Sequence, residues 1–409
     1  MNRYPKSRSL SLLSSATTVA TVAPTVAPVS LILQGQGVYL FDCSGASCAV
    51  RFLNADGSRE LLFDWSSSSC VCSRDKEVLT DPKNKSGLVG KPGASYWISI
   101  DYNNRQVYAG VGEARVETAI YCYTFPLAED RAFLESLTTV LASASVTPHR
   151  LLRDPITHAI PLVIKEMHEL TMRDVASAAF MPLSNLSLIG QKLHDCIGGV
   201  RFQLDDPDFP QFSRAIEASI ANPDGWCYKR LVEKATEFGP SNPQETYLRI
   251  TLNQNNGESP GIPYVMEIWP PGHFSPVHNH AGSHAIIRVL HGAIQVRLFP
   301  YLCADLSGVP AFATTSFHKG QETWISPTLN QTHQLTNVGK STCITIQCYM
   351  YDGKDRLHYD FFDYVDAAGM RKQYEPDSDM EFVAFKELMR AEWKGRKKGA
   401  CGSGGCCVA

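Results

Sequence analysis

The stretch from Gly272 to Gly292 reads GHFSPVHNHAGSHAIIRVLHG and decides the fold expected for the C-terminal half of the chain. In a β-strand, residues i and i+2 point to the same face, so His278 and His280 can direct their imidazoles at one point. Neutral imidazole is the commonest metal ligand among protein side chains. The pair therefore predicts a metal site on a strand, and the alternative is an HxH pair that arose by chance.

A second histidine motif follows downstream, where His333-Gln334-Leu335-Thr336-Asn337 forms an H-x3-N pattern. With the G-x5-H-x-H spacing of the first stretch, it resembles the two motifs of the cupin family. The resemblance implies a small antiparallel β-barrel that holds a metal ion in its mouth. Most cupins carry a glutamate at the place of Ala285, and its absence leaves three neutral histidines, His278, His280 and His333. This set resembles the cysteine dioxygenase branch.

Four further elements resemble cysteine dioxygenases in their order and rough spacing. They lie within residues 183–365 and are Asp224–Lys229, Tyr247-Leu248-Arg249, Ser283-His284 and Tyr349. The resemblance implies a non-haem Fe(II) enzyme that oxidises L-cysteine with O2 to cysteine sulfinate. Three neutral imidazoles leave Fe(II) its full charge and open coordination positions, which suits the binding of a thiolate and O2 together. Zinc would accept the same ligands but cannot supply electrons to O2.

The resemblance also assigns roles to four side chains around the metal. Arg249 would bind the substrate carboxylate through its guanidinium fork, and Tyr247 would steady that contact. Tyr349 would offer its phenol to the carboxylate or to oxygen, so Arg249 and Tyr349 are the expected catalytic residues. His284 would line the substrate pocket or orient a ligand. Without the resemblance, Arg249 would be expected on the surface and Tyr349 in the core.

Two residues depart from the cysteine dioxygenase pattern. Many animal members carry a cysteine at the place of Ala285 and crosslink it to the tyrosine, so no such crosslink to Tyr349 can form here. Gln347 stands where the family places the histidine of a Ser-x-His-x-Tyr relay, and glutamine cannot become positively charged. Two alternatives stay open: a dioxygenase for another thiol acid such as 3-mercaptopropionate, and a non-catalytic metal-binding sensor.

The overall composition narrows the class of protein. The 409 residues carry 38 Lys and Arg against 41 Asp and Glu, a net charge of −3, so we expect no nucleic-acid partner. No run of about 18 apolar residues predicts a membrane-spanning helix. The odd count of 13 cysteines, with no CxxC pair, indicates reduced thiols in a soluble, cytoplasmic protein. We expect it to be a monomer.

The N-terminal half reads as short β-runs between turn signals and predicts a β-sandwich. Within it, Tyr96–Ile100 and Gln106–Gly112 resemble the farnesoic acid O-methyltransferase-like module, a β-sandwich with no evident catalytic constellation. Apolar residues at helical spacing predict helices over Ala128–Ala144 and Leu186–Ile197. A capping box that starts at Ser378 predicts a C-terminal helix.

The expected fold is therefore mostly β, with a C-terminal cupin barrel, flanking helices and an N-terminal β-sandwich. The expected divisions are a disordered tail (1–30), the sandwich (31–127), a helical linker (128–182), the cupin domain (183–370), a C-terminal helix (371–395) and a basic, cysteine-containing tail (396–409). The first segment is Ser-rich and lacks acidic residues, so a transit peptide is the alternative to a disordered tail.

The chain ends Cys406-Cys407-Val408-Ala409, which fits the C-a-a-X pattern for prenylation at Cys406. Basic residues precede this motif at Lys394, Arg396, Lys397 and Lys398. A single lipid gives only marginal membrane binding, and a basic patch supplies a second signal. The tail thus predicts peripheral membrane association, and a frayed end with incidental cysteines is the alternative.

Overall fold

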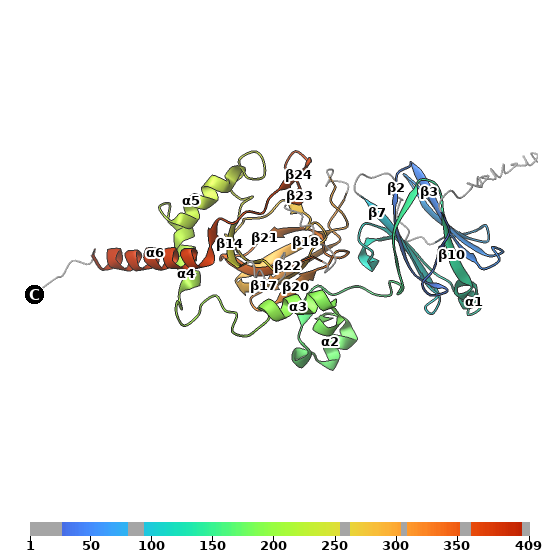
Figure 1. The fold of residues 1–409 in the computed structure, drawn as a ribbon, viewed down its shortest axis with the longest axis horizontal. Helices are drawn as coiled ribbons and strands as arrows, with labels where there is room; N and C mark the ends of the chain where they lie inside the picture. The colour runs from blue at the N-terminus through green and yellow to red at the C-terminus, as the bar shows by residue number, and fades with distance from the viewer. Residues whose placement is uncertain (1–26, 81–93, 254–261, 304–308, 352–360, 403–409) are drawn as a thin grey trace, which may run out of the picture.

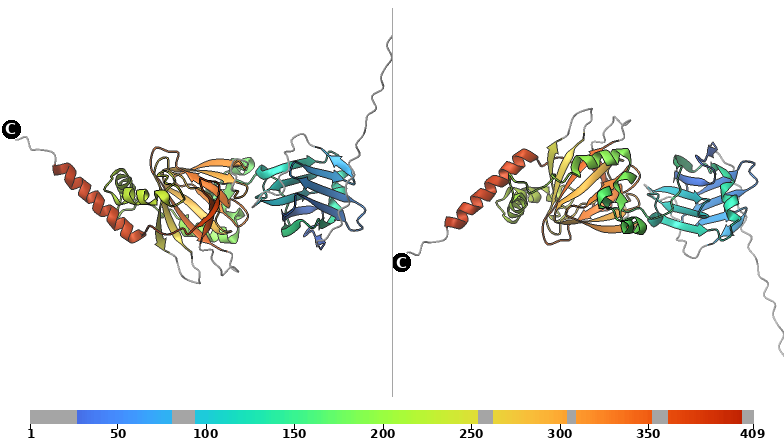
Figure 2. Two further views of the ribbon diagram at one scale, coloured as in Figure 1. Left: turned by 90° about the horizontal axis from the view of Figure 1, so that it is seen from above. Right: turned by 90° about the horizontal axis from the view of Figure 1, so that it is seen from below.

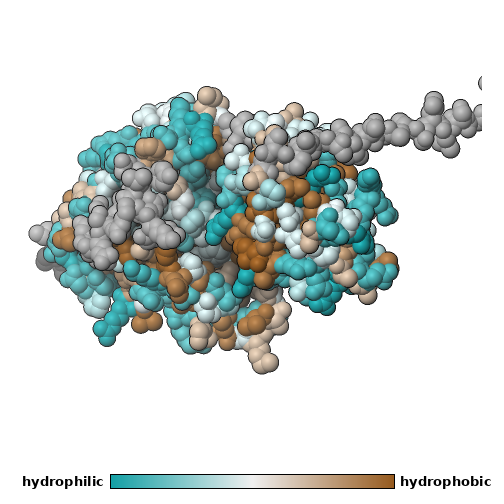
Figure 3. All heavy atoms as spheres, turned by 45° about the vertical axis from the view of Figure 1, so that its right-hand side comes forward, coloured by the Kyte–Doolittle hydropathy of each residue, from teal (hydrophilic) through white to brown (hydrophobic). Residues whose placement is uncertain are grey.

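The computed structural model describes residues 27–80, 94–253, 262–303, 309–351 and 361–402, with side chains up to Arg396. Two β units lie side by side, and helix α6 (Phe382–Gly402) extends from the second unit at the end opposite the first (Figure 1; Figure 2). On the face shown in Figure 3, hydrophobic side chains form patches among mainly hydrophilic ones. Within the described ranges, no helix is long and apolar enough to cross a membrane.

The N-terminal unit packs two antiparallel sheets against each other. Their strand orders are β1-β10-β3-β4-β5-β6 and β11-β2-β7-β8-β9. The strands are β1 (Val29–Ser30), β2 (Gln36–Cys43), β3 (Ser47–Asn54), β4 (Glu60–Ser66), β5 (Cys70–Arg74), β6 (Glu77–Leu79), β7 (Ser95–Asp101), β8 (Gln106–Val111), β9 (Ala119–Thr124), β10 (Leu137–Ala142) and β11 (Val146–Leu152). Phe41 on β2 stacks on Trp65 of β4 with 5.1 Å between ring centroids. Aromatic contacts of this kind join the two sheets and form the core of the predicted sandwich.

The helix expected over Ala128–Ala144 is wrong beyond its first turns. The chain forms a short helix, α1 (Asp130–Glu135), and then strand β10, which pairs with β3. The β-branched run Thr138-Thr139-Val140 favours a strand. Leu137, Val140 and Ala142 are the buried residues of this strand, and a bulge between Leu137 and Thr139 brings Leu137 onto the same face as the other two.

The prediction that residues 128–182 form a helical linker is also wrong. Strand β11 carries the sandwich to Leu152, and between that residue and Pro182 only two short strands, one 3₁₀ turn and one short helix appear. These elements are β12 (Ile164–Lys165), η2 (Met167–Glu169), α2 (Met172–Ser177) and β13 (Met181–Pro182), and the 3₁₀ turn η3 (Leu183–Asn185) follows them. Pro155 and Pro161 lie in residues 153–163, the part of this segment that forms no helix. Because β12 pairs with β20 of the second unit, this segment belongs in part to the barrel.

The second unit is a barrel of two facing, mainly antiparallel sheets. Their strand orders are β13-β12-β20-β17-β22-β15-β14-β25 and β19-β18-β21-β16-β23-β24. The strands are β14 (Leu248–Asn253), β15 (Tyr264–Trp269), β16 (Val277–His278), β17 (His284–His291), β18 (Ala293–Phe299), β19 (Ala313–His318), β20 (Glu322–Ile325), β21 (Thr332–Thr336), β22 (Cys343–Met350), β23 (Phe362–Val365), β24 (Arg371–Tyr374) and β25 (Met380–Glu381). Gly292 joins β17 to β18 with φ +69°, and a Cβ there would lie 2.5 Å from the carbonyl oxygen of Thr342. The expected fold class, mostly β with a cupin barrel and a second β unit, is confirmed.

Helices cover one side of the barrel. Helix α3 (Leu188–Ile197) agrees with the expected helix and packs on β17 and β22. The remaining helical elements are α4 (Phe212–Ala221), α5 (Trp226–Glu233), η1 (Val116–Thr118) and η4 (Lys234–Thr236). Phe212 of α4 contacts Phe385 of α6 with 5.9 Å between ring centroids, so α6 is anchored to the barrel through its first turns.

The C-terminal helix differs from the expected one in both bounds. It begins at Phe382 instead of 371 and continues to Gly402, past the boundary expected at 395. Ser378 does not cap it, because its hydroxyl accepts the N–H of Thr251 and donates to the carbonyl of Met380. The next residue, Asp379, accepts the backbone N–H of Arg249 at 2.7 Å. The groups that suggested a capping box are therefore used by the edge of strand β14.

Candidate metal centre

Three buried histidines come together inside the barrel. His278 ends β16, His280 follows two residues later, and His333 on β21 lies directly opposite His278 in the antiparallel pairing. One ligand atom of each ring lies within 4.8 Å of the others, and the ring centroids are 4.9, 4.8 and 4.6 Å apart. The β16–β21 pairing thus brings the two sequence motifs to one point.

Backbone carbonyls fix the tautomer of two of these histidines. Nδ1 of His278 lies 3.1 Å from the carbonyl oxygen of Pro276, and Nδ1 of His280 lies 3.3 Å from that of Gln331. Because a carbonyl oxygen can only accept, Nδ1 carries the proton in both rings. Nε2 therefore keeps the lone pair that a metal ion needs.

Burial keeps the three imidazoles neutral. It lowers the pKa of His278 to about 4, and it lowers the pKa of His280 and of His333 well below the ordinary value. Three neutral nitrogen donors in a buried site suit a divalent transition metal. The donor set therefore fits the expected Fe(II), and it would fit Zn(II) equally well.

We expect the metal-free protein to lose stability as the pH falls from about 6.5 towards 4. A histidine in the unfolded chain has a pKa of about 6.5, and burial lowers the pKa of His278 to about 4. Between these values the unfolded state binds more protons than the folded state, so the free energy of unfolding falls as the pH falls. Thermal unfolding of the metal-free chain at several pH values measures the effect. An equally steep loss in the His278→Gln variant would show that groups other than His278 cause it.

The cavity beside the histidines is lined by polar and aromatic side chains from both sheets. Its lining residues are Tyr247, Arg249, Glu267, Trp269, His278, His280, Ile287, His333, Leu335, Gln347, Tyr349, Phe362 and Tyr374. Tyr247, Arg249 and Tyr349, all expected from the sequence, therefore share one cavity with the three histidines. His284 is buried on β17 but is not among the described residues that line this cavity. Cys406 lies outside the described residues.

The charge of Arg249 is balanced by Glu267. The two residues are opposite each other in the β14–β15 pair, with 2.9 Å between guanidinium and carboxylate. Burial raises the pKa of Glu267, while Arg249 and the amide of Gln347 favour its ionised form. Sequence reasoning missed Glu267. The available signal was a single carboxylate within the otherwise apolar or aromatic strand β15.

Gln347 links Glu267 to Tyr349. Its amide nitrogen donates to the carboxylate of Glu267, and the hydroxyl of Tyr349 donates to its amide oxygen. Burial raises the pKa of Tyr349, so its phenol keeps the proton at neutral pH. Ala285 is opposite Tyr349 in the β17–β22 pair, and its methyl group cannot crosslink. Arg249, Glu267, Gln347 and Tyr349 thus form one chain of polar contacts along the cavity.

Tyr247 contacts a partner that the sequence did not indicate. Its hydroxyl lies 3.0 Å from the hydroxyl of Tyr374, and its ring stacks on Trp269 with 4.2 Å between centroids. Tyr374 and Phe362 come from β24 and β23 and also line the cavity. Sequence reasoning missed both, because no motif marks these two strands.

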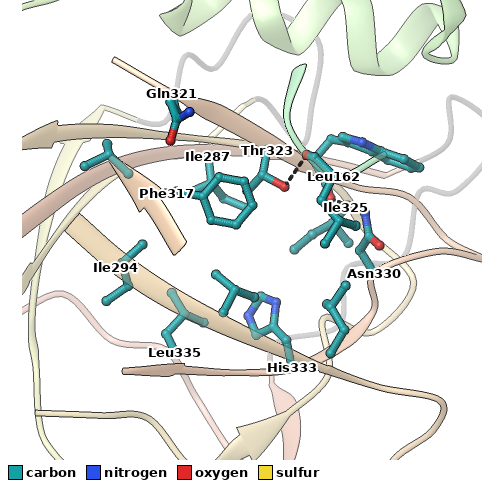
Figure 4. Close-up of a pocket in the computed structure, with 14 residues that line it drawn as sticks. Leu162, Ile287, Ile294, Phe317, Gln321, Thr323, Ile325, Asn330, His333 and Leu335 are labelled. Atoms are coloured by element: carbon teal, nitrogen blue, oxygen red, sulfur yellow. Dashed lines mark hydrogen bonds between the residues drawn. The ribbon is translucent and has the colours of Figure 1, made fainter. Parts of the chain in front are cut away.

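A second, apolar cavity adjoins His333 (Figure 4). Ile287, Ile294, Phe317 and Leu335 are among the residues that line it, and His333, Ile287 and Leu335 line both cavities. Mainly apolar side chains therefore form the wall of the barrel interior on the side of His333 that faces this cavity. Such a wall excludes water and strengthens electrostatic interactions inside the site.

Comparison with curated proteins finds partial similarity to one enzyme type. The chain is 25% identical to cysteine dioxygenase type 1 of Danio rerio over 138 residues, which are 34% of this chain and 62% of that protein. It is 26% identical to cysteine dioxygenase type 1 of Rattus norvegicus over 109 residues, 27% of this chain and 46% of that protein. The chain thus spans less than two thirds of the length of these relatives.

No family model matches the sequence, so the resemblance of the N-terminal strands to the farnesoic acid O-methyltransferase-like module stays a prediction. Matching solved structures include the Cupin_2 domain of an XRE family transcriptional regulator from Enterobacter cloacae, with 15% identity, a TM-score of 0.21, and coverage of 26% of this chain and 97% of that one. Oxalate oxidase in complex with the substrate analogue glycolate matches with 19% identity, a TM-score of 0.21, and coverage of 27% and 52%. The C-terminal unit is a cupin-fold barrel with a candidate three-histidine metal centre, and part of its sequence is similar to cysteine dioxygenases.

Proposed function

We propose that this protein is a non-haem Fe(II) dioxygenase that oxidises the thiol of L-cysteine to cysteine sulfinate. The thiol and one O2 molecule combine, both oxygen atoms end on sulfur, and no other oxidant is consumed. The observation that carries the proposal is a single cavity that holds three converging neutral imidazoles and the Arg249–Glu267 pair. Partial sequence similarity to cysteine dioxygenases supports it.

The Arg249–Glu267 pair matches the charges of an amino acid. Arg249 can bind the carboxylate of cysteine, and Glu267 can accept hydrogen bonds from its ammonium group. The pair is itself neutral, so a zwitterionic group adds no net charge to the buried cavity. 3-Mercaptopropionate lacks the ammonium group and cysteamine lacks the carboxylate. Each would leave one buried charge without a ligand partner, which favours L-cysteine over both.

When bound by His278, His280 and His333, iron would supply the redox chemistry and a positive centre that favours a thiolate. Tyr349 keeps its proton and can donate a hydrogen bond to the substrate, with Gln347 as its acceptor in the absence of substrate. The apolar wall beside His333 excludes water from the reacting thiol.

A second candidate function is a metal-loaded sensor of thiols or oxygen that does not turn over. Ala285 and Gln347 favour this candidate, because they replace the crosslinking cysteine and the relay histidine with groups that cannot crosslink or carry a charge. The histidine cluster and the Arg249–Glu267 pair in the same cavity favour the enzyme.

Oxygen uptake by the Fe(II)-loaded chain separates these functions. We expect uptake with L-cysteine, and kcat/KM values about 10- to 100-fold lower with cysteamine and 3-mercaptopropionate, because each lacks one charge-assisted contact. Equal rates with 3-mercaptopropionate would contradict the assignment of substrate. Thiol binding without oxygen uptake, seen by calorimetry on the iron-loaded chain, would support the sensor instead.

We further propose that the C-terminal tail attaches the protein to membranes through a prenyl group on Cys406. Each Lys or Arg near an anionic surface adds about 1 kcal/mol to the binding provided by a single lipid. In eukaryotic cells the wild-type chain should partition partly into membranes, and Cys406→Ser should remain in the supernatant. Replacing the four basic residues Lys394, Arg396, Lys397 and Lys398 with glutamine should release most of the lipidated chain. A C-terminal peptide that retains Val408 and Ala409 in mass spectra would contradict the proposal.

A further inference from the structure

The N-terminal unit contacts the barrel directly beside the metal centre. Glu113 follows strand β8 and is buried, with 8% of its surface exposed. Its backbone N–H donates to the carbonyl of Pro300 at 2.9 Å, and its carboxylate accepts the backbone N–H of Gln331 at 2.8 Å. At the neighbouring Gly112, a Cβ would lie 2.1 Å from the Pro300 oxygen. The two units are therefore in close contact at this point.

Gln331 holds the loop that carries His280. Its carbonyl oxygen lies 3.3 Å from Nδ1 of His280 and accepts that proton. Its side-chain oxygen accepts the N–H of Gly282 at 3.0 Å, and its side-chain nitrogen donates to the carbonyls of Ser283 at 2.9 Å and Ser326 at 2.6 Å. One residue thus fixes the imidazole of His280 and the backbone that follows it.

Arg115 secures the same turn from the N-terminal unit. It is 1% exposed, and its guanidinium donates to the side chain of Asn330 at 2.6 Å and to the carbonyl of Ile160 at 3.0 Å. Asn330 has a φ of +63°, which an isolated chain seldom adopts. Its side-chain nitrogen in turn donates to the carbonyl of Trp324 at 2.8 Å. Arg115 and Glu113 therefore hold Asn330 and Gln331 in a defined turn, with Asn330 in the left-handed region, just before His333.

Burying these two charges is costly unless each makes hydrogen bonds. Burial raises the pKa of Glu113 to about 7, while Arg115 and the N–H groups of the Asn330–Gln331 turn favour its ionised form. A pair of buried charges adds little stability compared with apolar side chains of similar size. Their contacts instead specify the geometry of one turn, the one whose carbonyl orients His280.

We propose that the N-terminal β unit completes the metal centre, with Glu113 as a positioning residue that orients His280 through Gln331. The proposal rests on the three-histidine site and holds whichever thiol is oxidised. Removing the acceptor on Glu113 frees the N–H of Gln331, and the carbonyl that accepts the Nδ1 proton of His280 loses its fixed orientation. Losing such a support for a metal ligand typically weakens metal binding about 10- to 100-fold.

The test compares metal binding in full-length variants, with Co(II) as the spectroscopic probe. Glu113→Ala should raise the dissociation constant for Co(II) about 10- to 100-fold and change the visible ligand-field spectrum at saturating metal. Glu113→Gln retains an acceptor oxygen and should restore both properties. Glu117→Gln is the matched control, because Glu117 lies in the same segment, 3.7 Å from Arg115, and should bind Co(II) like the wild type.

A second variant keeps the proposal testable if Glu113→Ala does not fold. Glu113→Met combined with Arg115→Met removes both contacts to the turn and leaves neither charge buried alone. It should show the same weakened Co(II) binding and altered spectrum. The proposal would be overturned if Glu113→Ala or the double variant folds and binds Co(II) with the affinity and the spectrum of the wild type, whatever its melting temperature. Because Co(II) binding needs no thiol and no O2, this failure is distinct from a failure of the proposed dioxygenase activity.

Discussion

Replacing any one of His278, His280 and His333 with alanine is expected to abolish both iron binding and thiol oxidation. The three rings offer one ligand atom each, and these atoms lie within 4.8 Å of one another. Two imidazoles leave a shell that is too open to hold Fe(II). We expect a loss of affinity beyond the roughly 100-fold that follows from removing a group that only supports a ligand.

Iron content by mass spectrometry and oxygen uptake with L-cysteine measure this effect on the same samples. His318→Ala is the matched control, because His318 is exposed on β19, away from the cavity. It should retain full iron content and full activity. An alanine variant of any of the three histidines with wild-type iron content and turnover would contradict the ligand assignment.

Loss of Arg249 is expected to raise the KM for L-cysteine about 10- to 100-fold, because a charge-assisted contact is worth roughly 1.5–3 kcal/mol. Iron content should remain unchanged, since Arg249 is not a ligand. Arg249→Ala alone also leaves the carboxylate of Glu267 buried without its partner, which typically costs about 3–5 kcal/mol of stability. The single variant therefore combines a binding effect with a folding effect.

A double variant separates the two effects. Arg249→Met with Glu267→Leu removes both charges, and replacing both partners costs far less stability than removing one. We expect this variant to fold, to bind iron, and still to show the raised KM. Arg297→Met, at an exposed position on β18, is the control for loss of a positive charge. A normal KM in the folded double variant would place the carboxylate contact elsewhere.

The three-histidine cluster could be predicted because its members lie in two short motifs. His278 and His280 are two residues apart, and His333 belongs to the H-x3-N motif. The spacing within each motif was therefore enough to identify the three histidines as candidate metal ligands. Strands with regular alternation of buried and less buried residues, such as β4, could also be predicted. The α1–β10 segment was not, because Leu137 and Val140 have helical spacing and share one face of β10 only through a bulge in its pairing with β3, which no local pattern indicates.

Contacts between distant residues could not be predicted from the sequence. Glu267 acquires its role from its register opposite Arg249, and register is set by the whole barrel. Glu113 meets Gln331 across 218 residues of sequence, and no local pattern in either segment indicates the other. The expected sandwich boundary at 127 and the expected helix start at 371 were wrong for a related reason, since the last strands of each unit pair with strands far earlier in the chain.

The proposed reaction inserts both atoms of O2 into a thiol. Its most direct test is to supply the Fe(II)-loaded protein with L-cysteine and isotopically labelled dioxygen in unlabelled water, and to weigh the product by mass spectrometry. We predict cysteine sulfinate in which both newly added oxygen atoms carry the label. A product that takes oxygen from water, or cystine with no sulfinate, would contradict the proposed dioxygenase reaction.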